Sequence, residues 1–279
     1  MDRQHAARLA ELIAADFYGK GLKLSGEKAE EAPRRWAEMP EIQAVARLRD
    51  AGADYVAVRR FLTFVAAMSR NRNFKKLLCA ALDLFGEDRA LFNPAVAATT
   101  PVPVLKDRLS TSSVSRKHKP DAEAWQTIAG SLTKPGPVMA AINDGMGDAT
   151  KVFRSLDTVA GGKARFPLLS GPKTKSLWMR LMVAPGKSRL GNLRHIPLAV
   201  DVHVRRATER LGVCDTQDAS TELARAAIQG EWLDVADMAD IDAPLRLGGS
   251  CLALDPALWV LGKYGVDEDY RHYRTMAGA

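Results

Sequence analysis

Apolar residues along the chain recur mostly at intervals of three and four, which is the spacing of a helix with one buried face. The clearest case follows Arg72, where the apolar residues are Phe74, Leu77, Leu78, Ala81, Leu82 and Phe85. Further helices are predicted over about 54–68 and 201–212. Another begins at Asp255, an N-cap acceptor with Pro256 behind it. Alternating patterns typical of half-buried strands are missing, so the chain is predicted to be all-α.

One segment, 94–121, departs from this helical pattern. It begins with Pro94 and contains three further prolines and a basic cluster: Pro101, Pro103, Pro120 and Arg116-Lys117-His118-Lys119. Prolines and small polar residues favour turns, so we expect a long surface loop here. The loop is either a tolerated insertion or a segment that contacts a phosphate backbone.

Composition narrows the class of protein. The chain has 279 residues, 47% of them hydrophobic and 26% charged, which suits one or two globular domains. Its longest nearly apolar stretch, 61–68, is far too short to span a bilayer, and the N-terminus lacks the apolar block of a secretory signal. We therefore expect a cytoplasmic protein. The cysteines, Cys79, Cys214 and Cys251, match no zinc or iron–sulfur spacing and are expected to be reduced thiols.

The net charge of +7 is unevenly distributed. Residues 163–210 hold eleven Lys or Arg against two Asp or Glu, a local net charge of +9. Residues 214–279 hold twelve acidic and five basic residues, a local net charge of −7. This polarity predicts one basic face, where an anionic partner such as nucleic acid would bind.

The middle of the basic segment contains a turn between two predicted helices. Leu168-Leu169 is interpreted as the end of one helix, Gly171-Pro172 as a tight turn, and Thr174 as an early residue of the next helix. The first backbone amides of a helix, together with its dipole, bind phosphate without reading base sequence. Lys173 and Lys175 add positive charge to this site.

Two motifs in this region resemble the helix-hairpin-helix DNA glycosylase superfamily, that of endonuclease III and 8-oxoguanine glycosylase. The motifs are Leu169-Ser170-Gly171-Pro172-Lys173-Thr174-Lys175 and Val200-Asp201-Val202-His203. The first is similar to the family's Leu-Pro-Gly-Val-Gly-x-Lys hairpin, and the second to its Val-Asp-x-His segment. The resemblance implies a hairpin motif over 166–183, with Lys175 as catalytic lysine and Asp201 as catalytic aspartate. Ala257–Gly265 resembles the family's late helix.

The chain departs from the family pattern in three ways. Lys173 replaces the second hairpin glycine. Lys175 and Asp201 are 26 positions apart, which leaves room for an inserted Gly186–Gly191 loop. Cluster-ligating cysteines near the C-terminus are missing, so no iron–sulfur cluster is expected. A structural monovalent cation at the hairpin is the one bound group that the resemblance implies.

The resemblance also implies two helical subdomains with the active site in the cleft between them. One would comprise 1–50 with 200–279, and the other 51–199. Besides the catalytic pair, the residues expected to contact DNA lie at the hairpin, at a turn similar to the family's DNA wedge, and beside the aspartate: Gly171, Lys173, Thr174, Ser176, Asn71, Arg72, Asn73 and His203.

The implied activity is excision of a flipped-out base from duplex DNA by a monomeric glycosylase. Asp201 would stabilise positive charge on the sugar, and Lys175 would form a Schiff base that permits strand nicking. The first expected substrate is 8-oxoguanine, and the alternative is a modified cytosine in phage DNA. A catalytically inactive helix-hairpin-helix DNA-binding protein, or a helical protein that binds an acidic protein, also fits the charge pattern. Lys175 could then be a phosphate contact or a solvated charge, and Asp201 a helix cap.

Overall fold

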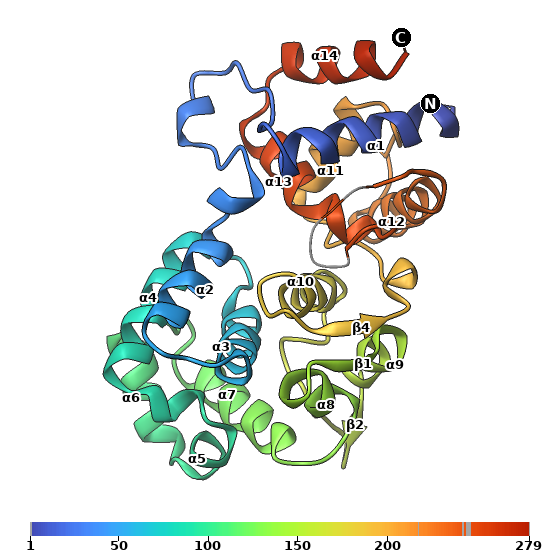
Figure 1. The fold of residues 1–279 in the computed structure, drawn as a ribbon. Coiled ribbons are helices and arrows are strands. Elements are labelled where there is room, and N and C mark those ends of the chain that lie inside the picture. The colour runs from blue at the N-terminus through green and yellow to red at the C-terminus, as the bar shows by residue number, and fades with distance from the viewer. Residues whose placement is uncertain (1, 217, 242, 244–246, 279) are drawn as a thin grey trace. The chain divides into compact units, whose positions relative to one another are not determined.

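The computed structural model describes residues 2–216, 218–241, 243 and 247–278. Within these residues it has fourteen α-helices, five short 3-10 helices and four strands of two or three residues. The protein is mostly helical, as its hydrophobic spacing predicts (Figure 1). Internal contacts divide the chain into unit 1, Met1–Met39 with Asn192–Ala279, and unit 2, Pro40–Gly191. The boundaries expected from the sequence were near residues 50 and 200.

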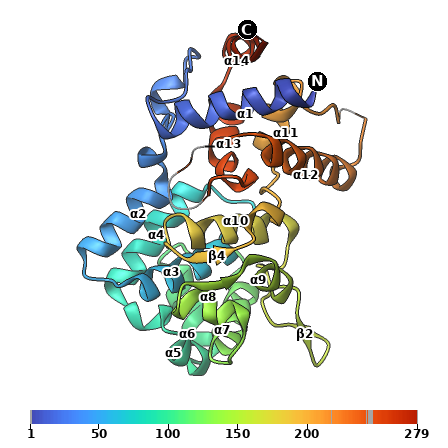
Figure 2. The same cartoon turned by 45° about the vertical axis from the view of Figure 1, so that its right-hand side comes forward.

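Unit 1 combines segments from both ends of the chain. Its described helices are α1 (Arg3–Tyr18), η1 (Ala29–Glu31), η2 (Trp36–Glu38), η4 (Leu193–His195), α11 (Val202–Arg210), α12 (Thr221–Met238), η5 (Cys251–Ala253), α13 (Asp255–Tyr264) and α14 (Asp267–Gly278). Helix α1 packs against α12 and α14, and α11 packs against α13 (Figures 1 and 2). Phe17, Trp232, Tyr270 and Tyr273 are almost fully buried and fill the core. Burial is the main source of stability for such side chains.

Unit 2 contains the remaining described elements. Its helices are α2 (Pro40–Asp50), α3 (Tyr55–Met68), α4 (Phe74–Glu87), η3 (Arg89–Phe92), α5 (Pro94–Thr99), α6 (Val102–Thr111), α7 (Lys119–Leu132), α8 (Pro137–Asn143), α9 (Ala149–Ser155) and α10 (Pro172–Val183). Strands β1 (Met146–Asp148) and β4 (Arg189–Gly191) pair in parallel, and β2 (Val159–Ala160) pairs antiparallel with β3 (Lys163–Ala164). These short pairs tie loops together and form no extended sheet.

Helix α3 forms the centre of unit 2. Asp54 caps it by accepting from the backbone amide of Ala57 at 2.7 Å, and ten of its fourteen residues are buried. The ring of Phe64 stacks on Trp125 of α7 with 4.3 Å between centroids. This burial explains why the segment is hydrophobic on nearly every face instead of on one stripe.

Helix α10 packs against α3, and two hydrogen bonds indicate that the helices run in opposite directions. The guanidinium of Arg59, early in α3, donates to the carbonyl of Gly186 just beyond α10. The hydroxyl of Thr63, four residues after Arg59, accepts from the indole of Trp178 at 2.9 Å. Trp178 is eight residues before Gly186. Residue numbers therefore rise along α3 as they fall along α10. The first turn of α10 lies toward the end of α3 at Met68.

The prediction of a long loop over 94–121 is wrong, because most of this segment is helical. Helices α5 and α6 occupy it, and both pack against α7. The prolines of this segment lie at helix starts, where a missing amide hydrogen costs nothing. Pro94 opens α5, Pro101 is the N-cap residue of α6, and Pro103 and Pro120 are the second residues of α6 and α7. A smaller correction concerns α13, which includes Asp255 as its first residue instead of its cap.

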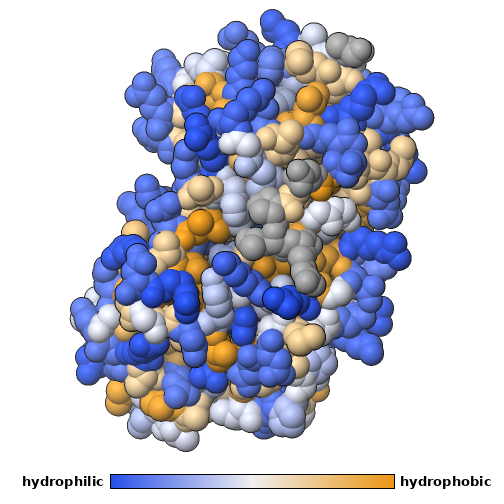
Figure 3. Space-filling view, viewed as in Figure 1, coloured by the Kyte–Doolittle hydropathy of each residue, from blue (hydrophilic) through white to orange (hydrophobic). Residues whose placement is uncertain are grey.

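The described surface is largely polar. Hydrophilic side chains cover most of the face shown in Figure 3. Large hydrophobic side chains that are exposed, such as Val159, Val202 and Leu223, belong to different elements. Within the described residues, no helix is both long enough and apolar enough to cross a membrane.

Candidate functional site

Lys175 lies in the first turn of α10 and is not a solvated charge. Only 13% of its side-chain surface is exposed. Its Nζ donates to Oδ2 of Asp157 at 2.7 Å and lies 4.5 Å from the centre of the Phe153 ring. A carboxylate on one side and an aromatic face on the other hold this amine in a defined position. The half-exposed Asp157 keeps the pair in contact with solvent.

The start of α10 is organised by Gly171 and Pro172. Gly171 is the N-cap residue and has no side chain to accept from the first amides of the helix. Thr174 is half-buried in this turn, and Lys173 is exposed. Ser176 is fully buried and donates to the carbonyl of Pro172, so its hydroxyl supports the turn from inside. The surface at this helix start is therefore formed by Gly171, Pro172, Lys173 and Thr174.

The helix expected before this turn is not formed, so the predicted hairpin over 166–183 contains only its second helix. Between α9 and α10 the chain forms the β2–β3 hairpin instead, followed by turns. Gly161 and Gly162 both have positive φ, as a two-residue hairpin turn with the right twist requires. Leu168, expected near a helix end, has a φ of 67°. The Gly-Gly pair favours a hairpin over a helix.

Asp201 lies in unit 1 and caps α11. Its Oδ1 accepts from the backbone amides of His203 at 2.9 Å and Val204 at 3.1 Å. The apolar residues before it are buried, and the residue itself is half-buried. The carboxylate is therefore fixed in orientation by the helix that it starts.

His203 and Gly262 lie where α11 meets α13. The imidazole of His203 packs edge-on against Trp259 with 5.7 Å between ring centroids. Burial lowers the pKa of His203 below its usual value, and the charge of Asp201 offsets this in part. The carbonyl of His203 lies so close to Gly262 that no side chain fits there. This geometry assigns His203 a packing role between two helices.

The turn between α3 and α4 holds the three residues predicted to act as a wedge. Asn73 caps α4 by accepting from the amide of Lys76 at 3.1 Å. Arg72 donates to the carbonyls of Ser113 and Val114. Asn71 is exposed and has a φ of 51°, so it stands at the tip of the turn. Of the three, Asn71 has the side chain best placed to project from the protein.

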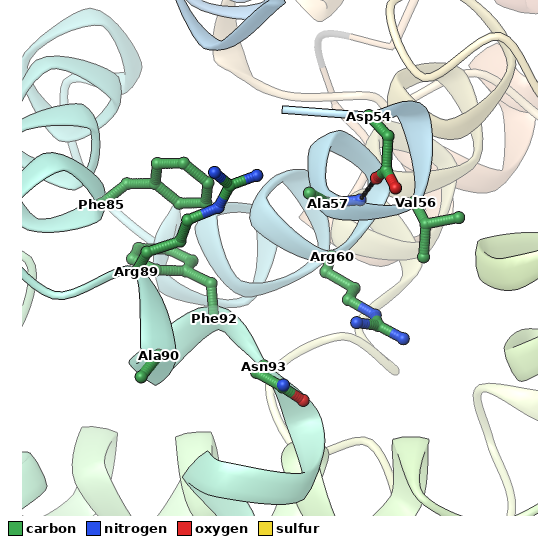
Figure 4. A pocket seen from close by; sticks show the side chains of 9 residues that line it. All are labelled: Asp54, Val56, Ala57, Arg60, Phe85, Arg89, Ala90, Phe92 and Asn93. Atoms are coloured by element: carbon green, nitrogen blue, oxygen red, sulfur yellow. Dashed lines mark hydrogen bonds between the residues drawn. The ribbon is translucent and has the colours of Figure 1, made fainter. Parts of the chain in front are cut away.

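A pocket of about 430 Å³ lies elsewhere in unit 2, lined by residues from α3, α4, η3 and the start of α5. Figure 4 shows Arg89 above the Phe85 ring, with Arg60 projecting from α3 on another side. Asp54, which caps α3, lies at its edge. No site residue predicted from the sequence lines this pocket, so it is separate from the Lys175 site.

Sequence reasoning missed Asp157 and Phe153, the two residues that hold Lys175. Asp157 is 18 positions before the lysine and follows α9, so no helical spacing links the two. Phe153 appeared in no motif and carries no charge. Across the part of the chain that the structure describes, no cluster of three or more His, Cys, Asp or Glu is arranged to hold a metal ion.

The structure brings together Lys175, Thr174, Lys173 and Gly171 at the start of α10, in unit 2. Asn71, Arg72 and Asn73 lie in the same unit, in the turn that follows α3. The first turn of α10 lies toward this end of α3. Asp201 and His203 lie in unit 1. No protein-family model matches this chain, and no curated protein sequence matches it significantly.

Proposed function

We propose that the protein is a DNA glycosylase that uses Lys175 as nucleophile and Asp201 as electrostatic stabiliser. The observation that carries the proposal is the confinement of Lys175 between Asp157 and Phe153 in the first turn of α10. A lysine that only neutralised a distant phosphate would gain nothing from such enclosure. The order of the two motifs, lysine then aspartate at a helix start, supports the same assignment.

The chemistry of base release makes distinct demands on the two residues. Breaking the N-glycosidic bond builds positive charge on the deoxyribose ring, and a fixed carboxylate stabilises that charge. The cap geometry holds Asp201 in one orientation, which suits this role. The neutral amine of Lys175 attacks C1′, the base leaves with the electrons of the N-glycosidic bond, and the nitrogen gives up a proton. The C1′–O4′ bond of the resulting aminal then breaks, with O4′ taking up a proton, and the Schiff base formed permits β-elimination.

Asp157 supplies the proton acceptor that this attack requires. Its Oδ2 lies 2.7 Å from Nζ of Lys175, which is within the distance for direct proton transfer. Half of the Asp157 side chain is exposed, so the proton can pass on to water. The carboxylate thus orients the amine before attack and removes its proton when the sugar arrives.

The DNA would lie across the first turn of α10. The amides there favour a phosphate, and Lys173 adds charge at the same place. Asn71, at the tip of the α3–α4 turn, would fill the space left by a flipped base. The first substrate to test is 8-oxoguanine, and a modified cytosine from phage DNA is the second.

The decisive experiment is borohydride trapping on duplexes that each contain one altered base. Wild-type protein is expected to form a covalent adduct with at least one duplex and to release its base. Lys175→Gln should abolish the adduct, because glutamine cannot form a Schiff base. Lys134→Gln is the control, since it removes an exposed lysine of the same unit.

Two outcomes would contradict the assignment. Trapping by Lys175→Gln at the wild-type level would transfer the nucleophile to another amine, with Lys173 the first alternative. Full base release by Asp201→Asn would remove the electrostatic role of the aspartate. Asparagine caps a helix nearly as well as aspartate, so the unfolding temperature of this variant should stay near wild type. A loss of activity would then report charge and not stability.

A further inference from the structure

Two basic segments far apart in the sequence are joined on the surface of unit 2. Residues 69–76 contain Arg70, Arg72, Lys75 and Lys76, and residues 113–119 contain Arg116, Lys117 and Lys119. Neither segment contains an aspartate or a glutamate. The first is the turn from α3 into α4, and the second leads from α6 into α7. We call the two together the composite basic surface.

Reciprocal arginine contacts hold the two segments against each other. The guanidinium of Arg72 donates to the carbonyl of Ser113 at 2.6 Å and also to that of Val114. In the opposite direction, Arg116 donates to the carbonyl of Asn71 at 2.7 Å. Each arginine directs these hydrogen bonds to backbone carbonyls, which carry no formal charge, and Asp121 is the acidic residue whose charge acts on Arg72. The turn and the loop therefore form one preorganised surface.

The second segment has a fixed backbone conformation. Oδ2 of Asp121 accepts from the amides of Arg116 and Lys117 and from the hydroxyl of Ser115, at 2.8 to 2.9 Å. Burial raises the pKa of Asp121, but these hydrogen bonds outweigh it and lower the pKa overall. Asp121 therefore fixes the backbone of the loop, on which Arg116 and Lys117 are both exposed.

Like charges are crowded here. Burial lowers the pKa of Arg72, and the nearby charge of Arg116 lowers it further. Arg70, Lys75, Lys76 and Lys117 are all exposed beside this pair. Lys119 has an acidic neighbour, Glu123, at 3.8 Å. Such crowding is unfavourable in the free protein and becomes favourable when an extended polyanion neutralises it.

The position of the surface relative to α10 indicates which polyanion fits. The turn at 69–73 begins where α3 ends, and the antiparallel packing places the first turn of α10 toward the same end. Lys173 and the composite basic surface therefore lie toward one end of the α3–α10 pair. The regularly spaced phosphates of a duplex can contact several of these cations at once, whereas a small anion would contact only one group.

We infer that the composite basic surface is a second phosphate-binding surface, which contacts the DNA backbone flanking the base pair that Asn71 would enter. The choice of DNA rests on the proposed function. The surface binds without reading sequence, because long basic side chains and no groove-reading element form it. Its contribution is affinity for any duplex, damaged or not.

The test is the binding of an undamaged duplex, followed by fluorescence anisotropy at several salt concentrations. The variant combines Arg70→Gln, Lys76→Gln and Lys117→Gln, three exposed positions whose side chains do not hold the two segments together. The matched control combines Lys23→Gln, Lys28→Gln and Arg274→Gln, which removes the same charge from exposed positions of unit 1. Equal thermal unfolding of the variants confirms that folding is preserved.

The composite-surface variant should bind about 10- to 100-fold more weakly, while the control stays within about 2-fold of wild type. The slope of log affinity against log salt should fall by about 0.9 for each phosphate that the variant no longer neutralises. Equal slopes in both variants would overturn the inference. Displacement of the duplex by polyglutamate at equal charge would also overturn it, and would favour an acidic protein as partner.

This outcome is separable from the fate of the proposed function. Base release with unchanged binding in the variant would leave the glycosylase standing and refute the second surface. Duplex binding that depends on the surface, with no base released from any substrate, would refute the glycosylase alone.

Discussion

The close approach of α11 and α13 makes a sharp prediction about Gly262. A Cβ atom at this position would lie 1.8 Å from the carbonyl oxygen of His203 and 2.5 Å from its carbon. A carbon and an oxygen in close contact are about 3.3 Å apart. Gly262→Ala therefore requires the two helices to separate locally by about 1.5 Å, within a buried interface.

The expected free-energy change has two opposed contributions. Alanine favours a helix over glycine by about 1 kcal/mol. Overpacking a core costs about 1–3 kcal/mol. The cost here should be about 3 kcal/mol, because the clash is with a backbone carbonyl, which cannot move to another rotamer as a side chain can. The variant should thus be about 2 kcal/mol less stable than wild type. Gly230→Ala is the control, because Gly230 lies within α12 of the same unit and nothing lies within 4 Å of its added Cβ.

Urea unfolding followed by circular dichroism measures both variants. Gly230→Ala should be about 1 kcal/mol more stable than wild type, so the two substitutions should have opposite signs. A Gly262→Ala variant as stable as wild type would refute the packing argument. Since α11 begins after Asp201, the displacement should also reduce base release in the proposed reaction, where a shift of about 1 Å can cost about 100-fold.

Three further predictions follow from individual contacts. Asp201→Ala should lower the free energy of unfolding by about 1 kcal/mol and Asp201→Asn by a few tenths, as measured by urea unfolding; equal losses would contradict the capping role. The pKa of His203 is lowered on folding, so the unfolded chain binds a proton first as pH falls through about 6.5. Wild-type stability should therefore fall more between about pH 7.5 and about pH 5.5 than that of His203→Gln, and parallel curves would exclude this contribution. Asp157→Asn should slow trapping through Lys175 by about 100-fold at neutral pH and less in alkali, where hydroxide removes the proton; a uniform loss at all pH values would indicate a positioning role only.

Long helices with regularly spaced apolar residues could be predicted from the sequence. Residues 74–87 and 55–68 form helices close to the predicted bounds, with Asn73 and Asp54 as caps. The short helices over 94–111 were not predicted, because proline marks both loops and helix starts. Only the burial of Ala97, Leu105 and Leu109 against neighbouring helices distinguishes the two. Local composition does not contain that tertiary information.

Residues of the candidate site could be predicted from the sequence only where they belong to a recognisable motif. Lys175 and Asp201 were identified by the resemblance, and the structure places each at the start of a helix. Phe153 lies in α9 and Asp157 just after it, and both contact Lys175. The segment between them and α10 forms a short hairpin and turns, whereas the sequence predicted that a helix ends there at Leu168-Leu169. The contacts between residues 71–72 and 113–116 span more than forty positions. Such contacts follow from how helices pack and leave no periodic trace in the chain.

The charge distribution along the sequence does not by itself show which cations are available to bind an anion, because some of them pair with acidic residues in the structure. Residues 163–210 carry a net charge of +9 in the sequence. At least four of its cations are committed within the protein: Lys175 to Asp157, Arg180 to the buried Glu41, Arg205 to Glu209 and Arg210 to Asp267. The composite basic surface is not apparent from the charge of any one segment, because its seven cations come from two segments that are far apart in the sequence. Six of these seven cations are exposed, and Arg72 is half-buried. A phosphate backbone is attracted by the field of solvent-facing charges and not by the count along a chain. Charge removal at 70, 76 and 117 should therefore weaken duplex binding at least as much as removal of three cations from 163–210.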